Sequence, residues 1–178
     1  MGTPYRPQAT ANFFLSKAAE DGVKLDQLKL GKLVYIAYGW VLAVLDEILF
    51  EEEIQAWKFG PVVPSIYHEF KKFGRSPVKG KSTHSEVGED WFIRVTTPEI
   101  PHSDDDVNQV LQKVWMLYKP YSGVALIRKT HEKGTPWESV HKKEERNIVI
   151  PDELIKPHFQ SLIRAYISRA NSKEKSAA

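Results

Sequence analysis

The histidines are the first candidates for metal binding or acid–base chemistry, and their spacing to acidic residues decides what they could do. There are six of them in the chain. His131 is followed by Glu132, but the second histidine that a zinc-binding helix carries four residues further on is missing. His141 lies near Glu144 and Glu145, a combination that is common on solvated helix surfaces. The histidines therefore predict no metal site.

Other catalytic patterns are also missing from the sequence. It contains no G-x-S-x-G nucleophile motif, no G-x-x-x-x-G-K-[ST] phosphate loop and no G-x-G-x-x-G dinucleotide motif. It has no cysteine, which removes thiolate metal sites, disulfides and a cysteine nucleophile. The acidic runs at 51–53 and 104–106 could pair carboxylates, but a solvated loop and a helix N-terminus explain them. We therefore expect no enzyme activity and no cofactor.

A basic stretch beside Phe70 and Phe73 is the candidate for nucleic-acid contact. Its members are Lys71, Lys72, Arg75, Lys79 and Lys81. Cations are also favoured at a helix C-terminus, and phosphate binding usually requires a denser basic surface. The net charge of +2 adds little support. Most of the five tryptophans and seven tyrosines are expected in the core, and a surplus would suit a protein-binding surface, since both residue types are common interface anchors.

The candidate residues above must be positioned by a hydrophobic core. The clearest element of that core is a helix predicted at residues 26–45. Asp26 is a good N-cap, and no charged residue occurs between Lys32 and Asp46. A helix that is apolar on all sides is buried, and this one is shorter than the about 20 apolar residues of a membrane span. No secretory leader follows Met1. We expect a cytoplasmic protein without membrane contact, built around this helix.

The remaining patterns arrange further helices and a little β-structure around that helix. Residues 91–97 predict a strand, and residues 148–150 a shorter one. A last helix is expected to end near residue 170, with its inward face formed by Phe159, Leu162, Ile163, Tyr166 and Ile167. The sequence predicts a mainly α fold with a small β element: a compact single-domain helical bundle over residues 1–170, with an exposed loop at 75–90 and a polar C-terminal tail at 171–178.

The stretch 56–64 is the most distinctive turn. Gly60 and Pro61 interrupt the backbone, and Pro64 suits the first position of a helix, where its missing N–H costs nothing. Trp57 follows an apolar segment, so we expect it to be buried against the central helix. Its replacement by alanine would then cost about 3–5 kcal/mol.

Three stretches of the chain together resemble a known family. They are LKLGKLVYIAYGW at 28–40, AWKFGPVVPSIYHEFKKFG at 56–74 and THEKGTPW at 130–137. In order and spacing they resemble the Panacea domain, formerly the DUF4065 group, which includes SocA-like antitoxins and phage-associated relatives. The resemblance covers about residues 8–167, nearly the whole chain.

The resemblance implies an antitoxin of a toxin–antitoxin system that neutralises a cognate protein toxin by direct binding. A SocA-type member also acts as a proteolytic adaptor that presents its toxin to the ClpXP protease, so ClpXP is a second expected partner. The matching motif residues either form scaffold or bind toxin, and we interpret them first as scaffold because a fixed turn requires such residue types: Trp57, Gly60, Pro61, Val62, Pro64, Tyr67, His131, Pro136 and Trp137.

Two alternatives and one terminal feature stay open. A DNA-binding transcriptional regulator of its own operon would use the basic stretch, although no helix-turn-helix is recognisable. A small hydrolase would use His131. Ala177 and Ala178 resemble the end of tags that ClpX recognises, although Ser176 stands where those tags usually carry leucine. They form either a protease-recognition tail or a tail without consequence.

Overall fold

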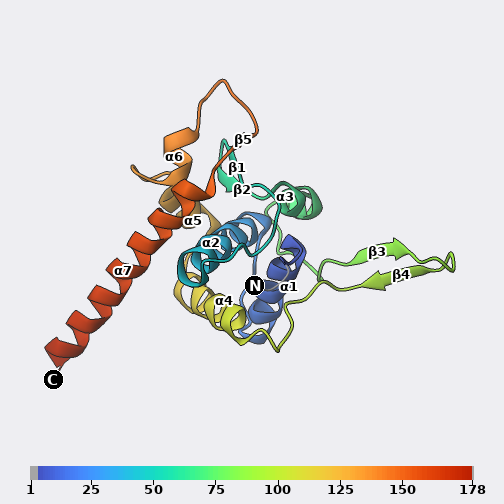
Figure 1. The fold of residues 1–178 in the computed structure, drawn as a ribbon, viewed down its shortest axis with the longest axis horizontal. Helices are drawn as coiled ribbons and strands as arrows, with labels where there is room; N and C mark the ends of the chain where they lie inside the picture. The colour runs from blue at the N-terminus through green and yellow to red at the C-terminus, as the bar shows by residue number, and fades with distance from the viewer. Residues whose placement is uncertain (1–3, 178) are drawn as a thin grey trace.

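The computed structural model describes residues 4–177, with side chains up to residue 172 (Figure 1). The helices are α1 (Pro7–Glu20), α2 (Gln27–Leu45), α3 (Pro64–Phe70), the short 3-10 helix η1 (Lys71–Phe73), α4 (Asp105–Tyr118), α5 (Gly123–Thr130), α6 (Pro136–Val140) and α7 (Asp152–Ala177). The strands are β1 (Gln55–Trp57), β2 (Gly60–Val62), β3 (His84–Val87), β4 (Ile93–Thr96) and β5 (Ile148–Val149). The prediction of a mainly α fold with a small β element is confirmed.

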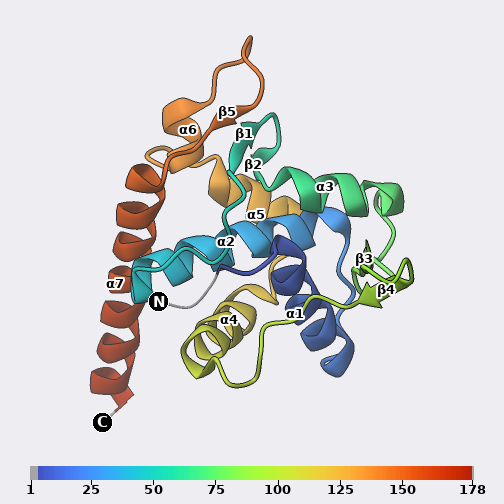
Figure 2. The same ribbon diagram turned by 45° about the vertical axis from the view of Figure 1, so that its right-hand side comes forward.

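Helix α2 is the centre of the core, as expected. The Asp26 carboxylate caps it by accepting a hydrogen bond of 2.7 Å from the backbone N–H of Lys29. Helices α1, α4, α5 and α7 all pack against it (Figure 2). Its 19 residues are long and apolar enough to cross a membrane by length and composition alone, yet 72% of that window is buried inside the protein. That burial is what a core helix shows.

Helices α1 and α4 pack against each other beside α2. Phe14 and Trp115 are fully buried between them, with ring centroids 6.3 Å apart. The Trp115 indole N–H donates to Asp21 at 2.8 Å, so its polar atom is satisfied. Each such buried aromatic or aliphatic side chain contributes about 1.5–3 kcal/mol through the hydrophobic effect.

The strands form two separate antiparallel sheets. In the first, β1 lies between β2 and β5, with Ala56 opposite Pro61 on one side and Ile148 on the other. In the second, β3 and β4 form a two-stranded hairpin that projects from the body of the protein (Figure 1). The expected strand at 91–97 is present as the shorter β4. Residues 75–90, expected to be loop, include strand β3 because β4 supplies a partner for it.

Helix α7 departs from two expectations. It continues to Ala177 instead of ending near residue 170, so residues 171–177 are helical and not an irregular tail. Lysine, glutamate and alanine propagate a helix well, and nothing in this stretch stops it. The expected inward face is also wrong in part: Phe159 is buried, but Leu162, Tyr166 and Ile167 are 37–51% exposed, because this half of α7 stands away from the body (Figure 1). Ala178 lies outside the described residues.

Candidate functional site

The expected motif residues come together where the β1–β2 hairpin meets α2, α3, α5 and α6 (Figure 2). We call this set the motif cluster: Trp57, Gly60, Pro61, Val62, Pro64, Tyr67, His131, Pro136 and Trp137. Hydrogen bonds and contacts between segments far apart in the sequence hold the motif cluster together. The Trp137 indole N–H donates to the backbone carbonyl of Trp57 at 2.7 Å, and His131 Nε2 lies 3.3 Å from the carbonyl oxygen of Lys58. The cluster is therefore organised around the backbone of one hairpin.

Trp137 is the buried centre of an aromatic stack. Its ring centroid lies 3.8 Å from that of His131 and 4.3 Å from that of His141, which is nearly parallel to it. Thr135 caps α6 by accepting from the N–H of Glu138, and Pro136 occupies the first turn of that helix. This N-cap sets the direction in which Trp137 leaves α6, toward β1.

Lys32 anchors the other end of the hairpin to α2. Its ammonium donates to the Pro61 carbonyl at 2.7 Å and is buried, and among the described residues no carboxylate forms an ion pair with it. Burial without such a partner lowers the pKa of Lys32 to about 7. Gly60 has φ +100°, and a Cβ there would lie 2.7 Å from Thr130 Oγ1. The position admits only glycine, since both the conformation and the space exclude a side chain.

Trp57 and Tyr67 form the side of the cluster that faces α3. Pro64 begins α3, as predicted, and the Tyr67 ring centroid lies 4.9 Å from that of Trp57. His68 also packs on the Trp57 ring, at 6.1 Å. The expectation that Trp57 is buried against the central helix is wrong: it is half-buried and faces α3. Truncating it should cost less than the about 3–5 kcal/mol expected for full burial.

The chemistry that this arrangement supports is structural. Both ring nitrogens of His131 lie near backbone carbonyl oxygens, Nδ1 at 2.7 Å from Ile127 and Nε2 at 3.3 Å from Lys58. A carbonyl oxygen accepts hydrogen bonds, so a ring N–H of His131 can hold the turn in place at this position. Within residues 4–177, no group of three or more histidine or acidic side chains could hold a metal ion. The geometry favours a scaffold role for the cluster.

Comparison with known proteins places the cluster in a family. Residues 30–138 match the family model described as "Antitoxin SocA-like, Panacea domain". The chain belongs to this family. The curated antitoxin SocA of Caulobacter vibrioides (strain NA1000 / CB15N) is 29% identical over 157 residues, which covers 86% of this chain and 81% of that protein. No solved structure matches the chain.

Membership of the SocA-like Panacea family supports an antitoxin role and suggests that this role is not enzymatic. The match begins in α2 and ends in α6, so the motif cluster and both hairpins lie inside it, whereas α1 and the whole of α7 lie outside. The motif residues quoted from the sequence thus carried the family resemblance correctly. Whether they also contact a toxin is a separate question, which depends on what the surface offers.

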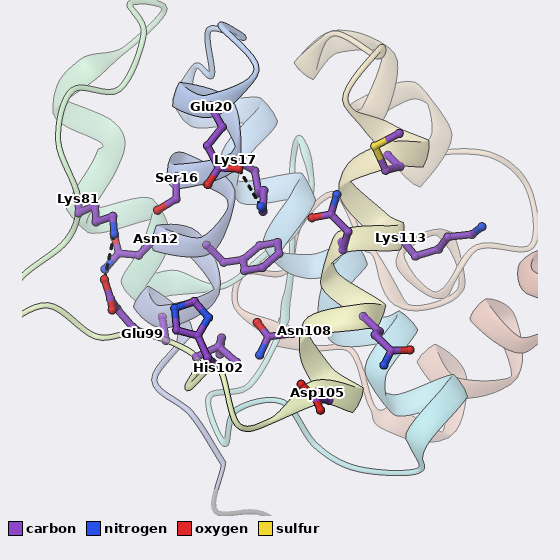
Figure 3. A pocket seen from close by; sticks show the side chains of 16 residues that line it. Asn12, Ser16, Lys17, Glu20, Lys81, Glu99, His102, Asp105, Asn108 and Lys113 are labelled. Carbon is purple, nitrogen blue, oxygen red and sulfur yellow. Dashed lines mark hydrogen bonds and ion pairs between the residues drawn. The ribbon is translucent and has the colours of Figure 1, made fainter.

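A pocket of the protein lies away from the motif cluster. It is an open cleft of about 770 Å³ between α1 and α4 (Figure 3). Four of the charged side chains that line it form two ion pairs, Lys17 with Glu20 at 2.8 Å and Lys81 with Glu99 at 2.9 Å. The pairing takes Lys81 out of the basic stretch proposed for DNA contact, whose other cations are exposed around the end of α3.

The surface feature that sequence reasoning missed is the β3–β4 hairpin of this Panacea chain. Its apolar side chains are 62–88% exposed: Val87, Trp91, Phe92, Ile93 and Val95. The aromatic and β-branched composition predicted the strand at 91–97, but composition is the same for a buried and an exposed strand. A useful signal was available in the flanks, because polar and charged residues surround this segment on both sides.

Proposed function

We propose that the protein neutralises a cognate protein toxin by binding it directly in the cytoplasm. The observation that carries the proposal is the relationship to antitoxin SocA along 86% of this chain. Two features of the structure support it. The histidine of the motif cluster is engaged with backbone carbonyls, and large apolar side chains stand exposed on a projecting hairpin. Exposed apolar groups of this kind mark protein-binding surfaces.

The test uses the reading frame next to the gene for this protein. Co-expression should restore growth that the neighbouring product arrests, and the two proteins should co-purify as a stable complex. The matched control is a Trp137→Ala variant, which should fail in both assays because it loses the buried stack. Rescue without any measurable association would show that neutralisation is not direct.

A finer form of the proposal makes the protein a proteolytic adaptor for ClpXP. The distinguishing experiment measures rescue and toxin half-life in cells with and without active ClpXP. Rescue that disappears without the protease supports delivery of the toxin, whereas rescue that persists supports masking alone. Replacing Ala177 and Ala178 with aspartate asks whether the C-terminal end is the element that docks on the protease, and unchanged half-lives of both proteins would exclude it.

A further inference from the structure

The β3–β4 hairpin has an apolar face that the rest of the described chain leaves uncovered. Its register pairs Val87 with Ile93 and Ser85 with Val95. Because side chains alternate between the faces of a strand, Val87, Ile93 and Val95 share one face, while the pairs between them place polar side chains on the other. In an antiparallel sheet such a face normally packs on a core. Here these three side chains are 62–71% exposed.

The tip of the hairpin carries a tryptophan in an unfavourable backbone conformation. The turn is closed by hydrogen bonds of 2.9 Å from the Gly88 N–H to Phe92 and from the Trp91 N–H to Gly88. Trp91 has φ +63°, the left-handed region that three-residue hairpin loops usually fill with glycine. Its side chain is 88% exposed. The free protein therefore bears the backbone strain without a packing gain that offsets it.

The hairpin is nevertheless held in place. The buried side chain of Asn12 holds the two ends of the hairpin together. The Asn12 amide N–H₂ donates to the backbone carbonyls of Ser82 and Pro98, and the Asn12 side-chain oxygen accepts from the Ser82 N–H. Near the tip, Arg94 pairs with Asp90 at 2.6 Å. A projecting element that is held at its base, with an ion pair inside its tip, loses less conformational entropy on binding than a free loop.

We propose that the β3–β4 hairpin is the toxin-binding element of this protein, and that its tip inserts into an apolar pocket of the toxin with a basic rim. The inference rests on the function proposed above. Trp91 and Phe92 are the anchors, of the residue types that dominate interface energetics. The segment 84–96 carries three acidic residues and one arginine, in a chain whose net charge is +2, which complements a basic rim.

The distribution of apolar groups favours an enclosing pocket over a second copy of this chain. Phe92 directly precedes Ile93, the first residue of β4. Because side chains alternate along an extended chain, the Phe92 ring and the Ile93 side chain lie on opposite faces of the hairpin. Another flat hairpin could cover the Ile93 face but would leave Phe92 in water.

The test compares Trp91→Gly and Phe92→Ser with a matched control, Val124→Ser, which alters an exposed apolar side chain on α5. Affinity of the full-length protein for the product of the neighbouring reading frame is measured by calorimetry, and Tm is measured on the free protein. Each hairpin variant should lose affinity about tenfold or more. Trp91→Gly should leave Tm unchanged or higher, since glycine accepts the left-handed turn. Val124→Ser should bind like the wild type.

Each contrary result has a distinct meaning. Wild-type binding that neither hairpin variant weakens overturns this inference and leaves the proposed function standing. A Tm lowered by several degrees in Trp91→Gly makes the tryptophan a structural residue and overturns it as well. Self-association of the free wild type that Trp91→Gly abolishes makes a second copy the occupant. A wild type that neither binds nor rescues overturns the proposed function, and the toxin as occupant with it.

Discussion

The protein contains two β-hairpins, and the rest of the chain contacts them in opposite ways. Three backbone carbonyls of β1–β2 lie against side chains from distant helices and turns: Trp57 against Trp137, Lys58 against His131, and Pro61 against Lys32. The β3–β4 hairpin is clipped only at its base, by Asn12 and a contact of 3.3 Å between Arg6 and His84. The first hairpin is built into the core, and the second is presented to solvent.

The difference shows that the partners of an aromatic residue, rather than its type, decide its role. Trp57 packs on Tyr67 and His68 and contributes to stability, whereas Trp91 has no ring neighbour among the described residues. An isolated two-stranded hairpin is marginally stable in water. The first hairpin is stable because the core holds it. The second is retained, at a cost in backbone strain, where only a binding partner could use it.

The largest expected effect is on stability at the first hairpin. Trp137→Ala removes a ring that is 9% exposed and lies between two imidazoles, so the free energy of unfolding should fall by about 3–5 kcal/mol. Trp91→Ala, the matched truncation in the second hairpin, should change it by less than about 0.5 kcal/mol. Urea unfolding of both variants checks this. Similar losses in the two would mean that the hairpins do not differ as described.

A second prediction uses pH to test how Lys32 holds the first hairpin. The unfolded chain keeps the lysine proton up to about pH 10.5, whereas burial lowers the pKa of Lys32 in the folded protein to about 7. The unfolded state therefore holds more protons between these values, and the free energy of unfolding should rise with pH across this window. From about pH 7 to about pH 9 the gain should be about 2 kcal/mol.

The control for this prediction is Lys32→Met, which keeps the length and apolar stem of the side chain but cannot titrate. The difference between the wild type and this variant isolates Lys32 from other groups, including Lys29, whose pKa burial also lowers. Urea unfolding at both pH values gives the two slopes. Parallel stability profiles for the wild type and Lys32→Met would mean that the ammonium is not held uncompensated against the Pro61 carbonyl.

Local signals in the sequence predicted the elements that depend on local physics. The Asp26 cap and the Pro64 helix start are both formed as expected, because each depends on residues within one turn. The contacts that close the motif cluster could not be predicted in the same way. They join side chains to backbone carbonyls 29 to 80 positions away, and a carbonyl carries no sequence signature.

Exposure was the other quantity that the sequence did not determine. The pattern of α7 predicted an inward face through Tyr166 and Ile167, and the helical period is indeed present, but the body of the protein ends before this half of the helix does. The strand at 93–96 was predicted for the same kind of reason and is exposed on both faces. Periodicity gives the faces of an element; tertiary packing decides whether anything covers them.

A last prediction removes the second hairpin altogether. His84 and Thr96 are paired in register, so a short Gly-Ser-Gly link can replace residues 85–95 without moving the base that Asn12 holds. The change removes three exposed cross-strand pairs, and each lost pair lowers the free energy of unfolding by about 0.2–1 kcal/mol. The shorter loop costs less entropy to close, which raises the free energy of unfolding by about 1 kcal/mol. The free energy of unfolding should therefore change by no more than about 2 kcal/mol, while toxin binding is lost. A shortened protein that unfolds several kcal/mol more easily would show that the hairpin belongs to the folding unit, and the contrast between the two hairpins would then be one of exposure alone.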